Sequence, residues 1–187
     1  DGQTDIAVWR GATGEWFVLR ASDQTYDITA WGAVSAGDVP APGDYDGDGK
    51  ADLICARSTP ASVAVLTNDG AGGFLLSTSP NVGPNPVHVA SGDVNGDGKP
   101  DLIAVNNDDA TLTVLTNNGR GGFAVSATPA VGSGPRWVEA VDVNRDGTLD
   151  LVAANGNGST LTVLTNRANG TFVLAASPAV GAGPISV

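Results

Sequence analysis

Three short segments of the chain carry acidic and amide side chains at alternate positions, in the pattern Asp-x-Asp/Asn-x-Asp-Gly-x-x-Asp. They begin at Asp44, Asp93 and Asp142, so consecutive copies start 49 residues apart. A hard cation such as Ca²⁺ takes about six to eight oxygen ligands, and a short loop supplies them when oxygens occupy alternate positions. The pattern therefore predicts three calcium-binding loops.

Each loop offers side-chain oxygens at its first, third, fifth and ninth positions and a backbone carbonyl at its seventh, as in the helix-flanked EF-hand loop. The predicted ligands are Asp44, Asp46, Asp48, Lys50 and Asp52 in the first loop, Asp93, Asn95, Asp97, Lys99 and Asp101 in the second, and Asp142, Asn144, Asp146, Thr148 and Asp150 in the third. Affinity rises with ligand charge. We therefore expect the first loop, with four carboxylates, to bind tightest, and the third, which carries Arg145, to bind weakest.

Plain turns are the alternative reading, because Asp and Asn tolerate positive φ and bond to their own backbone. A turn alone does not require four or five oxygens, and carboxylates this close repel one another unless a cation compensates them. An EF-hand would place a bidentate Glu at position twelve, where this chain has Cys55, Ala104 or Ala153 in β-type segments. A truncated copy, Asp1 to Asp5, lacks the first two ligands and is expected to be vacant unless the chain continues upstream.

The net charge of −11 argues against nucleic acid or an anionic membrane surface as a partner, since both require basic patches. No apolar stretch approaches the roughly 18–20 residues needed to cross a bilayer, so membrane insertion is not expected. The single cysteine, Cys55, excludes an intrachain disulfide, and its place in an apolar run predicts a small buried residue.

The 49-residue period, with four β-type segments in each copy, predicts an all-β chain of four-stranded propeller blades. In the best-defined unit the predicted strands are residues 86–94, 102–106, 111–116 and 123–127. The first unit is divergent, with strands expected near 6–10, 16–20 and 26–31. The chain is read as one propeller region, residues 1–187, with approximate repeats 1–43, 44–92, 93–141 and 142–187. Almost no helix is expected.

Ring closure has two solutions. The chain opens with the second to fourth strands of one blade and ends, at 185–187, within a first strand. The ends could share one blade and close a small four-bladed ring, or the chain could form about four blades of a larger ring. An open ring leaves strand edges free to pair with another copy, so a homodimer or aggregation is expected in that case.

The chain resembles the FG-GAP/VCBS repeat family, which includes the head of integrin α-subunits. The resemblance covers essentially all 187 residues and rests on DYDGDGKADL from Asp44, DVNGDGKPDL from Asp93, DVNRDGTLDL from Asp142, and the Gly-x-Gly-Pro connectors at Gly132 and Gly181. It implies Ca²⁺ in the loop between the first two strands of each blade, an extracellular or secreted location, and rings most often of seven blades.

Catalytic side chains are scarce: one His, one Cys and two Glu, with no nucleophile–base pair. We therefore expect a non-enzymatic extracellular module that binds a protein or carbohydrate ligand. Candidate contacts are the positions that differ between matching blades, Arg136, Trp137 and Glu139. Drift on an exposed surface is the alternative for these positions. The alternative function is a structural segment of a larger secreted enzyme, such as a polysaccharide lyase.

Overall fold

A computed structural model describes residues 6–10, 15–19, 26–30, 41–168 and 170–187. The truncated loop Asp1 to Asp5 lies outside these residues, and of the first three strands only the backbone is described. Every regular element in the described part of the chain is a strand, which confirms the all-β prediction. The first sheet contains β1 (Ile6–Arg10), β2 (Glu15–Leu19) and β3 (Tyr26–Ala30).

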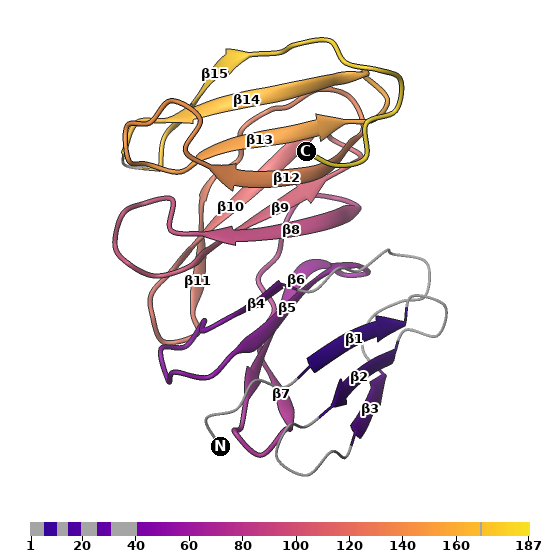
Figure 1. Ribbon diagram of the computed structural model, residues 1–187, viewed down its shortest axis with the longest axis vertical. Coiled ribbons are helices and arrows are strands. Elements are labelled where there is room, and N and C mark those ends of the chain that lie inside the picture. The colour runs from indigo at the N-terminus through magenta and orange to yellow at the C-terminus, as the bar shows by residue number, and fades with distance from the viewer. Residues whose placement is uncertain (1–5, 11–14, 20–25, 31–40, 169) are drawn as a thin grey trace.

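Three further sheets have four strands each and are copies of one design (Figure 1). Their strands are β4 (Ala41–Gly43), β5 (Asp52–Ser58), β6 (Ala61–Asn68) and β7 (Phe74–Thr78); β8 (Pro86–Gly92), β9 (Asp101–Asn106), β10 (Thr111–Asn117) and β11 (Phe123–Ala127); and β12 (Pro135–Val141), β13 (Asp150–Asn155), β14 (Thr160–Asn166) and β15 (Phe172–Ala176). Within each sheet the strands follow chain order and pair antiparallel. The strands predicted for residues 86–127 are confirmed to within two residues at each end.

The third and fourth strands of every four-stranded sheet are offset by one residue at the same place. The irregularity falls after Val65 in β6, Val114 in β10 and Val163 in β14. These three valines are equivalent in the 49-residue register, so the copies share a bulge as well as a strand pattern. A bulge increases local twist, which is the geometry a propeller blade requires.

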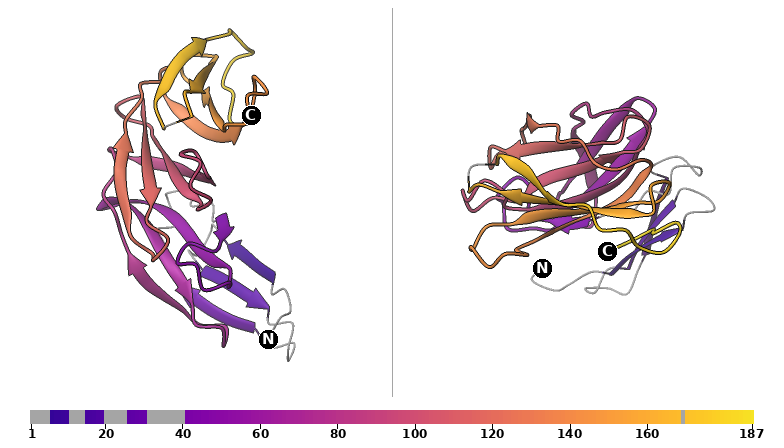
Figure 2. Two further views of the ribbon diagram at one scale, coloured as in Figure 1. Left: turned by 90° about the vertical axis from the view of Figure 1, so that its left-hand side faces the viewer. Right: turned by 90° about the horizontal axis from the view of Figure 1, so that it is seen from above.

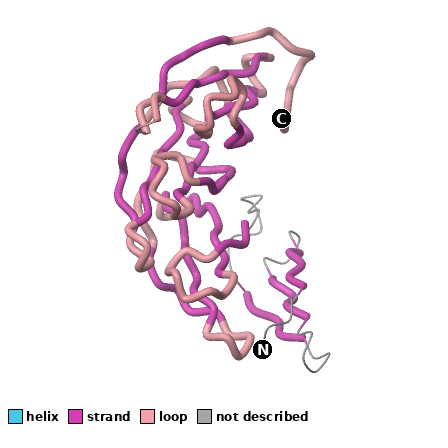
Figure 3. Tube along the Cα trace, turned by 60° about the vertical axis from the view of Figure 1, so that its left-hand side comes forward, coloured by secondary structure: helices cyan, strands magenta, loops and turns pink. Residues whose placement is uncertain are grey.

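The four sheets follow an arc, with β1–β3 at one end and β12–β15 at the other (Figures 2 and 3). The two ends do not meet, so the described residues form an open set of blades and not a closed four-bladed ring. The first strands of neighbouring four-stranded sheets, β8 and β12, lie against one another.

Each junction between four-stranded sheets is a separate apolar core. The first contains Tyr45, Ile54, Val63 and Val65 from one sheet against Val89, Leu102, Ala104 and Leu115 from the next. The second contains Val94, Ile103, Val105, Leu112 and Val114 against Val138, Leu151, Ala153 and Leu164. All of these side chains are almost completely buried. Because β9 packs on both faces, all six of its residues are buried, which explains why its sequence is an apolar run without alternation.

Candidate metal centre

The three predicted loops join the first and second strands of their sheets, as the family resemblance implied. Asp44 accepts hydrogen bonds from the backbone N–H groups of Gly47 and Gly49, at 2.8 and 3.0 Å. Asp93 and Asp142 accept the equivalent bonds. These bonds fold the loop around its first acidic residue, so contacts within the loop contribute to its shape.

The third and fifth positions continue the same pattern of short-range bonds. Asp46 accepts a bond from the N–H of Asp48 at 3.1 Å, and Asp48 accepts one from the N–H of Lys50 at 2.9 Å. Asp44, Asp46 and Asp48 each direct one carboxylate oxygen to within 4.8 Å of the other two. Three convergent carboxylates are a donor set that suits a hard divalent cation, and the first loop therefore fits Ca²⁺.

Asn95 and Asn144 take the place of Asp46 in the other two loops, which keep the same backbone conformation. Gly47 and Gly96 have φ of 83° and 79°, and Arg145 adopts 64° at the equivalent position of the third loop. Gly49, Gly98 and Gly147 also have positive φ, as the predicted bend requires. The three loops differ in the type of side chain that donates oxygens to a metal, but they share the same backbone conformation.

The seventh position contributes a side chain that the sequence reasoning overlooked. The Lys50 ammonium pairs with Asp48, and the Lys99 ammonium lies 3.0 Å from the carboxylate of Asp97. These contacts hold the pKa of Asp48 and Asp97 below the usual range of aspartate. In the third loop a hydrogen bond from the Thr148 hydroxyl lowers the pKa of Asp146. The lysines supply part of the positive charge that a metal ion supplies when bound.

The ninth position has a structural role that the ligand prediction did not anticipate. Asp52, Asp101 and Asp150 are completely buried. Asp101 accepts the backbone N–H of Val94 at 3.1 Å and that of Asn117 at 2.9 Å, one on each oxygen. Burial raises the pKa of Asp52 and Asp101, against the lowering effect of these bonds. The carboxylate thus fastens the loop to the end of the third strand.

An asparagine at the end of β10 and another at the end of β14 extend this connection to the preceding blade. Asn117 donates from Nδ2 to the carbonyl oxygens of Tyr45 at 3.1 Å and Pro100 at 3.0 Å. Asn166 makes the same pair of bonds to Val94 and Leu149. The metal loop of one blade is therefore bonded to the next blade. The sequence feature that could have drawn attention to these asparagines is the Leu-Thr-Asn triplet that ends β6, β10 and β14, which is identical in all three copies.

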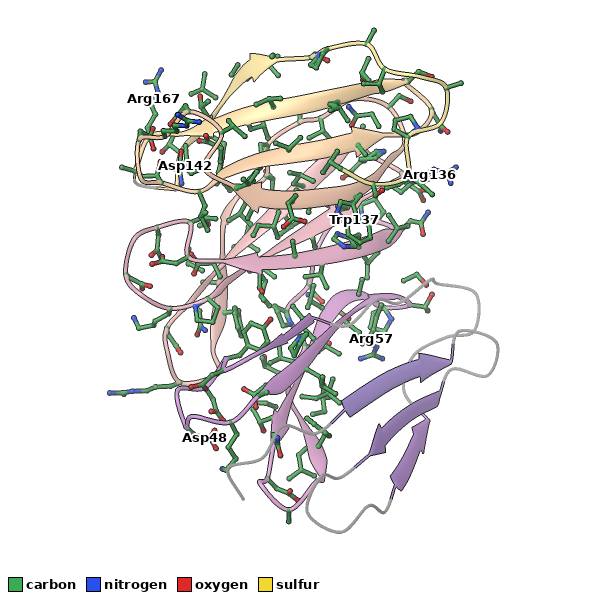
Figure 4. All side chains as sticks on the ribbon, in the orientation of Figure 1. Asp48, Arg57, Arg136, Trp137, Asp142 and Arg167 are labelled. Atoms are coloured by element: carbon green, nitrogen blue, oxygen red, sulfur yellow. The ribbon has the colours of Figure 1, made fainter. Side chains whose placement is uncertain are left out.

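The candidate ligand contacts lie at the opposite end of the sheets from the loops. Figure 4 shows Asp48 and Asp142 at one end and Arg136 and Trp137 at the other. The Trp137 ring stacks on the ring of His88 in the neighbouring blade, with centroids 3.8 Å apart. Arg136 and Glu139 are exposed. Trp137 therefore has a packing role, while the two charged residues are accessible.

His88 itself is 5% exposed, and its Nδ1 accepts a bond from the N–H of Val138 at 3.5 Å. Burial lowers its pKa to about 4. Trp137 Nε1 has no hydrogen-bond partner among the described residues.

Cys55 is buried, as predicted.

A model of the FG-GAP-like repeat matches residues 44–104, 93–153 and 142–187. These matches cover most of the chain, which therefore belongs to the FG-GAP repeat family, whose members are typically extracellular. A search of the characterised proteins gives no match. Among the described residues, none forms a helix with the length and apolar character needed to pass through a bilayer.

Several solved structures share the fold at low sequence identity. A protein of unknown function from Desulfotomaculum acetoxidans aligns with a TM-score of 0.66 at 15% identity, over 87% of this chain and 48% of its own. A periplasmic gluconolactonase from Pseudomonas aeruginosa gives 0.65 at 18% identity, over 91% and 49%. A lectin from Agrocybe aegerita, described as recognising non-reducing terminal N-acetylglucosamine, gives 0.61 at 20%, over 95% and 49%. The chain spans about half the length of these proteins, and the similarity establishes a β-propeller fold.

Proposed function

We propose that this chain is a calcium-stabilised, non-enzymatic propeller module that binds a protein or glycan ligand outside the cell. The observation that carries the proposal is the convergence of Asp44, Asp46 and Asp48 in a loop whose backbone recurs twice in register. Because such loops are bonded to the neighbouring blade through Asn117 and Asn166, a metal that orders them also stabilises the blade junctions.

Calcium would be held by the side-chain oxygens at the first, third and fifth positions of each loop, with the seventh-position carbonyl and the ninth-position carboxylate completing the predicted set. Bound Ca²⁺ supplies charge compensation and rigidity, and its ligand positions are then filled, which leaves none for a substrate. The chain's own contribution is to hold the oxygens of Asp44, Asp93 and Asp142 in place through backbone N–H bonds.

The test is thermal unfolding with millimolar calcium, with magnesium and with chelator, combined with calorimetric titration. A site saturated to 100 times its Kd adds about 2.7 kcal/mol to the free energy of unfolding, so the melting temperature should rise clearly with calcium. Asp48→Ala should remove the first site from the titration. Asp109→Ala, which removes an acidic residue outside the loops, is the matched control. A melting temperature that ignores calcium would refute the proposal.

The ligand-binding part of the proposal rests on the exposure of Arg136 and Glu139 beside the half-buried Trp137. A propeller lectin among the structural neighbours shows that a protein of this fold can recognise a sugar. Screening against a glycan array and extracellular protein fractions identifies the ligand. The triple alanine variant of these residues should then lose binding, and full retention would exclude this surface as the site.

A further inference from the structure

We propose that Asn157 is an acceptor for an N-linked glycan. It begins the triplet Asn157-Gly158-Ser159, which has the Asn-x-Ser/Thr form that N-glycosylation requires. Asn169 begins the one other such triplet in the sequence, and it lies outside the described residues. The proposal rests on the extracellular location proposed above, because this modification is made on the surface loops of secreted chains.

The fold places the triplet at the surface, in the turn that joins β13 to β14, and Asn157 is exposed there. Two backbone hydrogen bonds hold this turn against the connector that precedes β12. The N–H of Gly156 donates to the carbonyl of Gly134 at 2.9 Å. The N–H of Gly158 donates to the carbonyl of Ser133 at 3.0 Å. A glycan on Asn157 therefore extends from an anchored turn into solvent and displaces no core side chain.

The amide of Asn157 is free, whereas the equivalent side chain of the preceding sheet is engaged. In the 49-residue register Asn157 corresponds to Asp108, whose carboxylate accepts a hydrogen bond from Asn85 Nδ2 at 2.8 Å. Gly134 takes the place of Asn85 in the last sheet. The Asn157 side chain has no hydrogen-bond partner among the described residues. A Cβ at position 134 would lie 2.4 Å from Asn157 Nδ2, so the glycine leaves the space that this amide occupies.

The hydroxyl of Ser159 completes the triplet on a backbone that the fold also forms without it. Ser159 has a φ of 51°, and its counterpart Ala110, in the turn between β9 and β10, has a φ of 54°. The first four-stranded sheet has Ala61 at the same position. The turn conformation therefore does not require the hydroxyl. Of the three four-stranded sheets, only the last combines an amide and a hydroxyl in this turn.

The reaction that this acceptor supports is transfer of an oligosaccharide from a lipid-linked donor. Nδ2 of Asn157 forms a bond to C1 of the reducing-end sugar, and the bond between C1 and the lipid diphosphate breaks. The proton of Nδ2 passes to a base of the cell's oligosaccharyl transferase, and the lipid diphosphate leaves. Ser159 supplies the hydroxyl that the transferase requires at the third position of the triplet.

The glycan borders the candidate ligand contacts and is remote from the metal loops. The Arg136 side chain lies over Gly156, since a Cβ on that glycine would be 2.6 Å from Arg136 Nε. Figure 4 shows Arg136 at the end of the sheets opposite Asp142. A glycan on Asn157 should therefore leave calcium binding unchanged and limit access to the surface around Arg136.

Secretion of the chain from a eukaryotic cell line, followed by tryptic peptide mapping, tests the proposal. Cleavage after Arg145 and after Arg167 puts Asn157 in a different peptide from Asn169. The peptide that contains Asn157 should carry a glycan. Enzymatic release of the glycan in heavy-oxygen water should convert Asn157 to a labelled aspartate. The label separates this conversion from spontaneous deamidation, which precedes release and incorporates ordinary oxygen.

Ser159→Ala removes the hydroxyl, keeps the amide and should abolish the glycan on Asn157. Ala110 has the same backbone conformation at the equivalent position, so this variant should fold. Asn157→Asp gives the turn the acidic residue of the preceding sheet and should also abolish the glycan. Asn118→Asp is the matched control: Asn118 is exposed and is followed by glycine, but it begins no triplet, and its counterpart is Asp69. This control should keep the glycan.

An unmodified Asn157 in the secreted, folded chain would overturn the proposal, as would a glycan that persists in Ser159→Ala. Equal loss in the Asn118→Asp control would also overturn it, because the effect would then not depend on the triplet. Calcium titration of the same preparations is read separately. A glycosylated chain that binds no calcium contradicts only the proposed function, and a calcium-binding chain without sugar on Asn157 contradicts only the glycan site.

Discussion

The contribution to stability of the hydrogen bond from Asn117 to the preceding blade can be measured by comparing alanine substitutions at equivalent asparagines. Asn117→Ala removes Nδ2 bonds to the carbonyls of Tyr45 and Pro100 and the bond that Oδ1 accepts from the N–H of Gly119 at 2.8 Å. Asn68 makes the corresponding bonds within its own blade, to the carbonyl of Ala51 at 3.0 Å and from the N–H of Gly70 at 2.9 Å. Among the described residues, Asn68 Nδ2 donates within its own blade and not to a carbonyl of another blade, so Asn68→Ala is the comparison.

Within the described part of the chain, the two substitutions therefore differ by one hydrogen bond across a blade junction, and Asn117 is also the more deeply buried of the two side chains. A bond of this kind contributes about 1 kcal/mol, and leaving its buried partner unsatisfied costs about 1–3 kcal/mol. Asn117 is 4% exposed, so water cannot readily replace the lost donor. We expect Asn117→Ala to lower the free energy of unfolding by about 1–2 kcal/mol more than Asn68→Ala, which is roughly 2–8 °C in melting temperature for a chain of this size.

Urea and thermal unfolding with chelator present measure this difference without a contribution from bound metal. Asn166→Ala should match Asn117→Ala, because its Nδ2 donates to Val94 at 2.6 Å in the next junction. If Asn68→Ala is as destabilising as the other two, the bond between blades contributes nothing, and the reasoning that couples the loops to the junctions is refuted.

Three other predictions follow from the loops and the buried histidine. Arg145→Gly should stabilise the chain by about 1 kcal/mol, because the backbone of Arg145 is held at a φ of 64°, and it should tighten the third calcium site. Arg120→Gly removes the same charge from another exposed loop and should have neither effect. Equal effects of the two substitutions would rule out backbone strain as the cause. Calorimetric titration of single-loop variants should rank the Asp44 loop tightest and the Asp142 loop weakest, and the reverse order would contradict the role of ligand charge. Stability should fall as pH drops from about 6.5 towards 4, because the pKa of His88 is lowered to about 4 in the folded chain, so the unfolded state takes up the proton first. The loss is at most about 3 kcal/mol. His88→Gln in saturating calcium should abolish that part of the profile, and an unchanged profile would show that His88 is not its source.

The sequence by itself determined the blade, because every signal that defines it is local or repeats along the chain. The loops are shaped by hydrogen bonds between residues two to five positions apart, such as those from Gly47 and Gly49 to Asp44, so a nine-residue motif is enough to predict the turn. The strands of the β8–β11 sheet follow from apolar runs between turns. The 49-residue register made the three copies support one another, and a sequence repeat of this kind already implies that identical faces stack.

Only the tertiary structure decided the roles that depend on contacts between blades. Asp101 looked like a ligand from its position in the loop, and its burial between Val94 and Asn117 shows that it also fastens the loop to a strand. Asn117 stands in the repeated Leu-Thr-Asn triplet, but the repeat does not identify its partner as Tyr45, 72 residues away. Trp137 looked like an exposed candidate until its ring was found on His88. Whether the arc closes was equally open, because closure depends on how each sheet packs on the next, and a pattern within one blade does not encode that angle.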